Sequence, residues 1–326
     1  MRILVIGGRS FVGRHFVEAA LAHGHEVTLL NRGKKNPELF THLDSIRGDR
    51  SEIAELVAGR SWDAVFDSCG YLPSLVEKSA KALKGNAGQY VFISTISVYP
   101  LGPTPGPDEN SERLKLQVPG EELTGETYGP LKALCEDAVW SEFGDGATVL
   151  RPGLIIGPHD PTDRFTYWVE RCAQRRPFVA PARASQPLQL LDARDLGEFA
   201  LRVVEQERPD VFNVAGPEAG TDFGSVIDLA GDQFGNVAEP LWLSPDQLQE
   251  AELDLWNDLP LSAPLDGSQD GLMAASISKA LQNELELRPL EESIRDIQDW
   301  RVSLPAEPMK TGLTEERQSE LIDRYG

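Results

Sequence analysis

Short apolar runs alternate with segments of helical periodicity through the first half of this 326-residue chain. Runs rich in Val, Ile, Leu and Phe predict strands, whereas apolar residues recurring every third or fourth position predict helices. The predicted strands cover residues 3–6, 26–30, 45–47, 64–66, 90–93 and 148–150. The predicted helices cover residues 11–23, 51–58, 75–83 and 128–143. Alternation at this spacing predicts an α/β fold with a doubly wound parallel sheet covered on both faces.

Two later regions depart from this alternation. Prolines and glycines interrupt residues 101–119, which are therefore expected to form a loop. Further on, the pattern predicts helices at 165–175 and 195–204 and strands at 188–191 and 211–215. Either Asp192 or Asp195 is expected to cap the second of these helices. Beyond residue 216 the chain is acidic and mostly helical in pattern, and residues 314–325 are expected to form a helical arm.

A glycine-rich segment joins the first predicted strand to the first predicted helix. It comprises Gly7, Gly8, Arg9, Ser10, Phe11, Val12 and Gly13. Glycines here let the backbone turn tightly beside a pyrophosphate, and the helix N-terminus offers free N–H groups and positive potential. Ser10 stands where a middle glycine is usual, but it is small and can donate to phosphate. The position directly between strand and helix favours a Rossmann-type cofactor site over a plain turn.

The domain boundaries follow from these elements. Residues 1–152 are expected to form the NAD(P)-binding Rossmann domain, to which residues 188–215 return. Residues 153–187 and 216–326 are expected to form a smaller, mostly helical C-terminal substrate domain.

The end of the second predicted strand bears on the choice of cofactor. A site for NAD places an acid there to accept from the ribose 2′-hydroxyl. This chain instead has Asn31 and Arg32, followed by two lysines and preceded in the glycine loop by Arg9. Such cations suit a 2′-phosphate, although a solvated basic turn would look the same. NADP(H) is therefore favoured, with NAD(H) as the alternative.

A tyrosine and a lysine in the predicted helix 128–143 suggest acid–base chemistry. Tyr128 and Lys132 are four residues apart and so lie on one face of the helix. An ammonium beside a phenol favours the phenolate and makes tyrosine a usable acid or base near neutral pH. The strand ending at Ser94 and Thr95 supplies hydroxyls at a carboxyl edge, where such sheets bind ligands.

Together these motifs resemble the extended short-chain dehydrogenase/reductase superfamily, in its NAD(P)-dependent epimerase/dehydratase family. The resemblance covers about residues 1–215, and its start also resembles an atypical subgroup that includes chloroplast stem-loop RNA-binding proteins. It implies that Tyr128 is the catalytic acid/base, that Lys132 binds the nicotinamide ribose and lowers the tyrosine pKa, and that Thr95 orients the substrate oxygen, with Ser94 as its substitute. The further cofactor-binding positions that it implies are Asp49, Arg50, Cys69, Gly70, Ser94, Pro152 and Gly153.

The segment after Gly153 is expected to cover the substrate. The candidate substrate-binding residues are Ser97, His159, Arg164, Tyr167 and Gln189. Arg164 could clamp a carboxylate or phosphate, although an ordinary helix start explains this segment equally well. Trp242 and Trp256 are expected to pack rather than to bind. No metal is expected from His159 and the acids near it, because the family chemistry needs none.

The charge and the composition restrict the classes of partner that the protein can bind. The net charge is −21, but residues 1–204 carry only −3 and residues 205–326 carry −18. Nucleic acid and anionic membranes are therefore disfavoured as partners, while a local basic pocket remains compatible with the near-neutral first part. Three widely spaced cysteines indicate neither a disulfide framework nor a zinc site. With no apolar targeting segment, a cytoplasmic protein is expected, and a homodimer remains open.

The sequence thus predicts an NAD(P)-dependent oxidoreductase acting on a carbonyl or carbinol of a small, sugar-like molecule. Ile96 and Ser97 follow Thr95 where dehydratases of the family place acids, which argues against dehydration. A sugar-nucleotide epimerase is the alternative within the family. The alternative that is not an enzyme is a cofactor-sensing or RNA-binding protein with the same fold.

Overall fold

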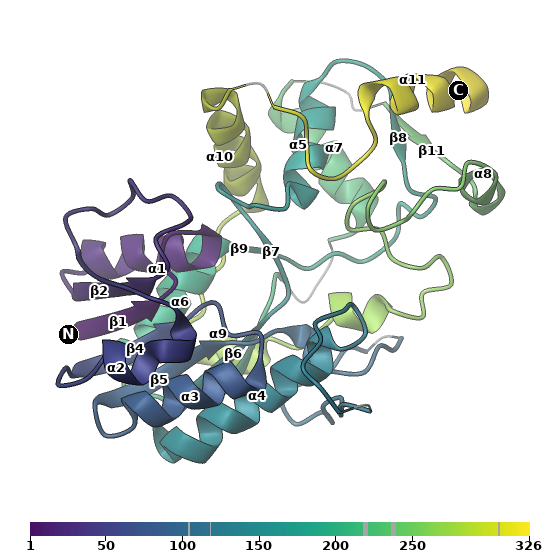
Figure 1. The fold of residues 1–326 in the computed structure, drawn as a ribbon. Coiled ribbons are helices and arrows are strands. Elements are labelled where there is room, and N and C mark those ends of the chain that lie inside the picture. The colour runs from purple at the N-terminus through teal and green to yellow at the C-terminus, as the bar shows by residue number, and fades with distance from the viewer. Residues whose placement is uncertain (104, 118, 218–220, 236–238, 306) are drawn as a thin grey trace.

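The computed structural model describes residues 1–103, 105–117, 119–217, 221–235, 239–305 and 307–326. A seven-stranded parallel sheet forms the centre of the first lobe, with strand order β10-β6-β5-β4-β1-β2-β3 (Figure 1). Its strands are β1 (Arg2–Ile6), β2 (Glu26–Asn31), β3 (Asp44–Arg47), β4 (Trp62–Asp67), β5 (Ala87–Ile93), β6 (Ala147–Pro152) and β10 (Val211–Val214). The sequence-based prediction of an α/β fold with a doubly wound sheet is confirmed.

Helices cover both faces of this sheet because its central strands are apolar on both sides. One face carries α1 (Phe11–Ala22) and α6 (Ala193–Glu205), and the stacked rings of Phe16 and Phe66 lie in this core. The other face carries α2 (Ile53–Leu56), α3 (Pro73–Leu83) and α4 (Tyr128–Phe143). The sheet is thereby closed to solvent except at its edges, so a ligand can reach it only where the strands end.

The second lobe has its own apolar core. Its elements are β7 (Leu154–Ile156), α5 (Arg164–Ala173), β8 (Phe178–Ala180), β9 (Leu190–Asp192), α7 (Phe223–Gln233), β11 (Pro240–Trp242), α8 (Pro245–Glu250), α10 (Leu290–Ser303) and α11 (Glu315–Tyr325). β7 pairs with β9 and β8 pairs with β11, both in parallel. The short α9 (Ser278–Gln282) lies on the first lobe instead, because Ile277 and Ala280 pack into the core beside α6.

Short 3₁₀ turns complete the description. They are η1 (Arg50–Glu52), η2 (Ile96–Val98), η3 (Gly144–Gly146) and η4 (Asp270–Met273). The helix expected at 51–58 is therefore split into η1 and the four-residue α2, because Asp49 caps a tight turn by accepting from the Ser51 N–H at 3.0 Å. Asp192 caps α6 by accepting from the Arg194 N–H at 2.9 Å, which decides between the two caps that the sequence left open.

The C-terminal helix was expected to be an arm, and this was wrong. Leu321 on α11 is fully buried in the second core, and the Gln318 amide donates to the Tyr167 hydroxyl at 2.6 Å. The proline-rich segment 101–119 has no α-helix or strand among its described residues, and positions 104 and 118 lie outside them. None of the helices in the described ranges combines the length and apolar character needed to cross a bilayer.

Candidate functional site

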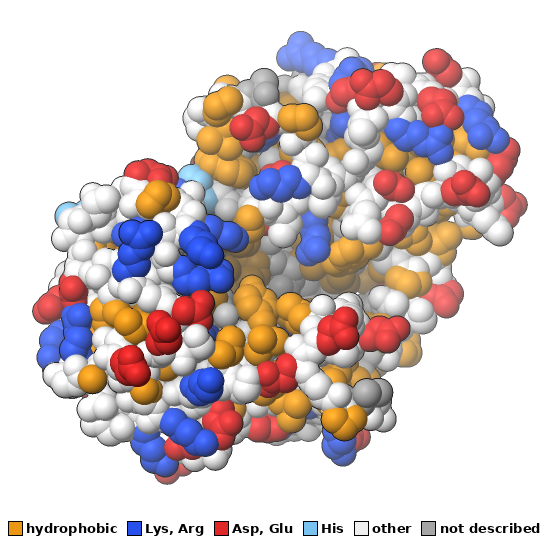
Figure 2. Space-filling model, in the orientation of Figure 1, with side chains coloured by type: hydrophobic (Ala, Val, Ile, Leu, Met, Phe, Trp, Pro, Cys, Tyr) orange, Lys and Arg blue, Asp and Glu red, His pale blue; other side chains and the backbone are white. Residues whose placement is uncertain are grey.

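The site lies where the strands of the main sheet end, in the hollow between the two lobes. Apolar side chains form much of the floor of this hollow, and Lys and Arg side chains gather on the rim that belongs to the first lobe (Figure 2). A cavity of about 720 Å³ opens there. Most of the predicted cofactor residues line it, namely Gly7, Gly8, Arg9, Ser10, Phe11, Val12, Gly13, Asn31, Arg32, Asp49, Arg50 and Cys69.

The glycine loop has the backbone conformation that its sequence suggests. Gly7 and Gly8 have positive φ values of 111° and 82°, a region that side chains disfavour. A Cβ atom on Gly13 would lie 2.7 Å from the backbone nitrogen of Gly8, so the first turn of α1 can approach the loop only with glycine there. Ser10 precedes α1 as its N-cap, and its side chain makes no capping hydrogen bond. The free N–H groups of α1 therefore face the cavity beside a hydroxyl.

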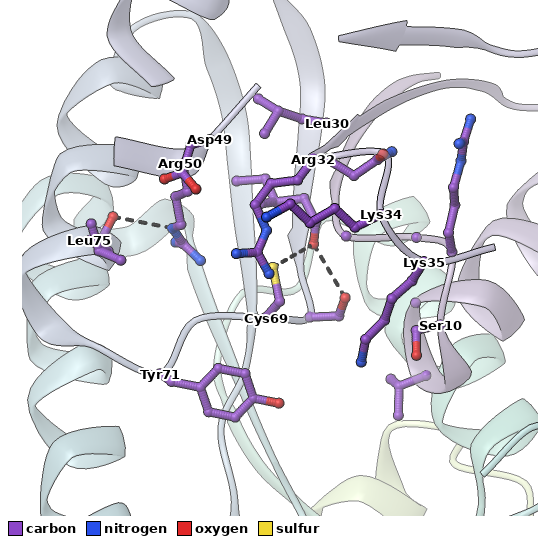
Figure 3. A pocket seen from close by; sticks show the side chains of 18 of the residues that line it. Ser10, Leu30, Arg32, Lys34, Lys35, Asp49, Arg50, Cys69, Tyr71 and Leu75 are labelled. Atoms are coloured by element: carbon purple, nitrogen blue, oxygen red, sulfur yellow. Dashed lines mark hydrogen bonds between the residues drawn. The ribbon is translucent and has the colours of Figure 1, made fainter. Parts of the chain in front are cut away.

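Three cations extend over the cavity from the loop that follows β2. Arg32, Lys34 and Lys35 all line it, with Asp49 opposite (Figure 3). The hydrogen bonds from Ser51 are the main reason that the pKa of Asp49 is lowered, and the charges of Arg32 and Lys34 add to this effect. The Asn31 carboxamide accepts from the Gly33 N–H at 2.9 Å and so shapes the turn. This end of the cavity is positive, which suits an additional phosphate.

Arg50 lines the cavity wall, but its positive charge is paired with a carboxylate inside the protein. Its guanidinium forms a two-point ion pair with Asp67, which is fully buried. The Tyr90 hydroxyl donates to the same carboxylate at 2.7 Å, and Arg50 also donates to Ser79 at 2.8 Å. The Asp67 charge raises the pKa of Arg50 in spite of its burial. We therefore regard Arg50 as part of the cavity wall.

Cys69 and Gly70 follow β4 at the middle of the cavity. The Cys69 thiol lies 3.5 Å from the Ile6 carbonyl oxygen (Figure 3), and desolvation raises its pKa to about 11, so the thiol stays protonated at neutral pH. Cys69 is thus an exposed residue of the cavity wall whose thiol is mainly protonated at neutral pH. Gly70 does not line the cavity; its carbonyl oxygen accepts a hydrogen bond from Lys132.

Tyr128 and Thr95 meet at the inner end of the site. Desolvation raises the pKa of Tyr128, although a hydrogen bond with Thr95 and the nearby charge of Arg164 oppose the rise. The Lys132 ammonium donates to the carbonyl oxygens of Gly70 and Ile93, each at 2.6 Å. Lys132 is not among the groups that shift the pKa of Tyr128 in this structure. The role of Lys132 beside Tyr128 stays a prediction.

Ser94, the proposed substitute for Thr95, belongs to a different network. Its hydroxyl donates to Glu136 at 2.5 Å. Glu136 is fully buried and is also held by Arg151, which donates to it at 2.6 Å and 3.0 Å. The Ser94 hydroxyl is therefore committed to a structural carboxylate. The Thr95 hydroxyl accepts from the Ser97 N–H at 3.1 Å and donates to the Ser97 hydroxyl at 3.2 Å, and, unlike Ser94, Thr95 lines the smaller of two cavities.

A second, smaller cavity of about 140 Å³ continues from Thr95 toward the second lobe. Ser97, Gly153 and Trp256 line it, together with Ile96, Leu154, Ser262, Ala263, Gln269, Leu272 and Met273. Arg164 lies with its guanidinium carbon 5.0 Å from the centre of the Trp256 ring. Trp256 therefore borders the site, whereas Trp242 packs edge-on against Phe223 as expected.

Four of the predicted binding residues lie elsewhere. Tyr167 is 1 % exposed and belongs to the second core. Gln189 is buried and donates to the carbonyl oxygens of Gly216 and Ala275. His159 packs its ring against those of His15 and Trp300, between the lobes. Pro152 is buried within β6 and lines neither cavity. In each case a residue that lies near the cleft in sequence is used for packing or for internal hydrogen bonds.

Sequence reasoning missed several residues that line the two cavities, and Tyr71 and Trp256 are the aromatic ones among them. Tyr71 lines the larger cavity (Figure 3), and the centre of its ring lies 5.5 Å from the Lys132 nitrogen. Its place directly after Cys69 and Gly70, at a strand's carboxyl end, was an available signal. Trp256 had no local signal, because it reaches the site from an irregular segment of the acidic second part.

Comparisons with known proteins bear on the family and the fold of this chain. The model of the NAD dependent epimerase/dehydratase family matches residues 3–82 and 74–215. The chain is 25 % identical over 258 residues to the chloroplast stem-loop binding protein of 41 kDa b from Arabidopsis thaliana, covering 73 % of this chain but only 64 % of that protein. It is 26 % identical over 285 residues to a dTDP-4-dehydro-6-deoxy-D-allose reductase from a Streptomyces species, covering 73 % and 82 % of the two chains.

A solved structure gives the same picture of the fold. The UDP-glucuronic acid 4-epimerase from Bacillus cereus, determined in complex with NAD, superposes with a TM-score of 0.66. The superposition covers 92 % of this chain and 99 % of that one, at 18 % identity.

Proposed function

Since this chain belongs to the NAD dependent epimerase/dehydratase family, we propose that it is an NADP(H)-dependent oxidoreductase. Its substrate would be a small, sugar-like molecule whose carbonyl is reduced or whose carbinol is oxidised. The observation that carries this proposal is the position of Tyr128, which contacts Thr95 of the smaller cavity and lies near Tyr71 of the basic, dinucleotide-sized cavity. When bound, the nicotinamide cofactor supplies or accepts a hydride.

The residues present fit such a cofactor. The N–H groups of the glycine loop, the α1 N-terminus and the Ser10 hydroxyl would hold the pyrophosphate. Asp49 and Arg50 border the part of the cavity on the adenine side, next to the cations after β2. Arg32 and Lys34 would bind a 2′-phosphate, which supports NADP(H) over NAD(H).

The chain's own residues account for the proton. In the reductive direction the Tyr128 Oη would donate its proton to the substrate oxygen as that oxygen gains charge. Thr95 would hold the same oxygen by its hydroxyl. The pKa of Tyr128 lies above neutrality, so the phenol carries a proton to give at neutral pH. Lys132, held between Gly70 and Ile93, would bind the nicotinamide ribose.

The smaller cavity supports a substrate with a ring and an anionic group. Trp256 offers an aromatic face, and Arg164 lies over it as a cation. The similarity to a dTDP-sugar reductase supports a sugar nucleotide as the substrate class.

The test is an assay for the reduction of a dTDP-4-dehydro-6-deoxy sugar, run once with NADPH and once with NADH. Turnover is measured as the loss of absorbance of the reduced cofactor. We expect turnover and a lower Kd for NADPH. Tyr128→Phe should lower kcat by about 10²- to 10⁴-fold with the Kd for NADPH unchanged. Tyr167→Phe is the matched control, because it removes a phenol buried outside the site. Undiminished activity in Tyr128→Phe would refute the assignment, and tighter binding of NADH would refute the NADP(H) preference.

The same reaction mixture distinguishes an epimerase from a reductase. An epimerase of this family would change the stereochemistry of a sugar nucleotide without net consumption of the cofactor, so product analysis by chromatography would find an isomer while the absorbance stays constant.

A further inference from the structure

Two histidines and a glutamate meet on the first lobe, at the sheet edge opposite the cofactor cavity. His23 directly follows α1, His25 directly precedes β2, and Glu205 is the last residue of α6. The His23 Nδ1 and the His25 Nε2 lie 3.1 Å and 2.7 Å from the same carboxylate oxygen of Glu205. The two imidazole rings are nearly parallel, with centroids 6.4 Å apart and planes inclined by 29°. One ring nitrogen from each histidine therefore converges on one point.

This convergence is the arrangement that a transition metal requires. The three ligand atoms all lie within 4.8 Å of one another. A tetrahedral zinc ion with bonds of about 2.0 Å holds its ligand atoms about 3.3 Å apart, so shifts of less than an ångström in side-chain ends would admit one. We propose that His23, His25 and Glu205 bind a divalent first-row transition ion, with Zn²⁺ as the representative of the class. Imidazole and carboxylate are ligands of that class, whereas Mg²⁺ prefers oxygen alone.

The surroundings of His23 support the proposal independently of the three ligands. Its other ring nitrogen, Nε2, lies 3.4 Å from a carboxylate oxygen of Glu198, which stands about two turns before Glu205 on α6. A carboxylate that accepts from the outer nitrogen fixes the tautomer so that Nδ1 presents its lone pair to a metal. The outer nitrogen of His25, Nδ1, accepts from the Met1 ammonium at 3.1 Å, so metal binding at Nε2 requires that ammonium to give up its proton or move away. Only His23 is held from outside the triangle in the tautomer that a metal requires.

Exposure and charge leave room for an ion with water. The side chain of His25 is 10 % exposed, whereas those of Glu205 and His23 are 32 % and 44 % exposed. The site is closed on the His25 side and open on the His23 side, where water can fill the fourth position.

A metal here would join two segments that are far apart in sequence. It would tie the turn between α1 and β2 to the end of α6, and these two helices pack together on one face of the sheet. Because binding to the native state alone stabilises a protein, Zn²⁺ should raise the melting temperature. The histidines would otherwise serve as ion-pair partners of Glu205 and Glu198, an arrangement that needs no metal and gives no such rise.

The experiment is a Zn²⁺ titration of the chelator-stripped protein, purified without a histidine tag, by calorimetry at pH 7.5. We expect one ion per chain, a melting temperature that rises with Zn²⁺, and no displacement by Mg²⁺. His23→Ala and His25→Ala should each abolish the calorimetric signal and the rise. Glu198→Gln should weaken binding by about tenfold, because it removes only the group that orients His23.

The matched control is His42→Ala, which removes an exposed histidine of the same lobe outside the triangle. It should bind Zn²⁺ like the wild type. Failure of the wild type to bind Zn²⁺, or binding that survives in the His23→Ala/His25→Ala double variant, would overturn the proposal. Melting of the metal-free variants confirms that each is folded, and their reductase activity reports separately on the proposed function.

Discussion

The ammonium nitrogen of Lys132 lies 2.6 Å from the carbonyl oxygen of Gly70, and only 3 % of the lysine is exposed to solvent. A second carbonyl, that of Ile93, accepts from the same nitrogen, which also lies 4.1 Å from the centre of the Phe92 ring. One buried charge thus joins three parts of the first lobe: helix α4, the end of strand β5, and the segment that follows strand β4. Desolvation by this burial lowers the pKa of Lys132 to about 8.

Lys132 should therefore make stability depend on pH in the alkaline range. The unfolded chain keeps the proton up to about pH 10.5, whereas the folded chain releases it near pH 8, so the unfolded state binds more protons between these values. Stability should rise with pH across this window, by about 3 kcal/mol from this group. Urea unfolding of the wild type and of Lys132→Met at pH 7 and pH 10 measures it. The prediction fails if the difference between the two proteins is independent of pH.

Arg32→Ala should weaken NADPH binding by about tenfold, because a charge-assisted hydrogen bond to phosphate contributes about 1.5–3 kcal/mol. The Kd for NADH should change little, since NADH lacks the 2′-phosphate. Arg208→Ala, at an exposed position outside the cavity, is the control. Fluorescence titration with both cofactors decides the matter, and an equal loss for NADH would assign Arg32 to another part of the cofactor.

Gly13→Ala should abolish cofactor binding. Its Cβ would meet the Gly8 nitrogen at 2.7 Å and the Ser68 hydroxyl at 2.8 Å, so the loop must move away from α1. We expect a loss of about 1–3 kcal/mol in unfolding free energy as well. Gly59→Ala controls for the loss of a glycine, because it meets no atom within 4 Å and carries only its own strain from a positive φ. Retained NADPH affinity in Gly13→Ala would contradict the close approach.

Trp256→Ala should raise KM for the substrate about tenfold and leave the Kd for NADPH unchanged, because Trp256 borders only the smaller cavity. Trp242→Ala should instead lower the melting temperature with KM nearly unchanged, since Trp242 packs against Phe223. Steady-state kinetics and thermal melts of both variants give the comparison. If the two variants behave alike, Trp256 is a packing residue.

The local elements could be predicted because each depends on neighbours in sequence. The glycine loop, the helix starting at Tyr128 and the buried strands follow from backbone sterics, periodicity and burial. In the glycine loop, Gly7, Ser10 and Gly13 all lie within one strand–turn–helix unit. The sequence alone therefore determined the α/β fold and most of the residues around the larger cavity.

Tertiary structure decided what distant side chains do to one another. Only packing showed that Glu136 occupies the Ser94 hydroxyl, that Lys132 is turned to backbone carbonyls, and that Tyr167 is buried. Only packing brings Trp256 to the site, or His23 and His25 to Glu205. The physical reason is that desolvation, hydrogen bonding and ligand convergence depend on distances in space. Residues up to 182 positions apart in the chain set those distances here, between His23 and Glu205.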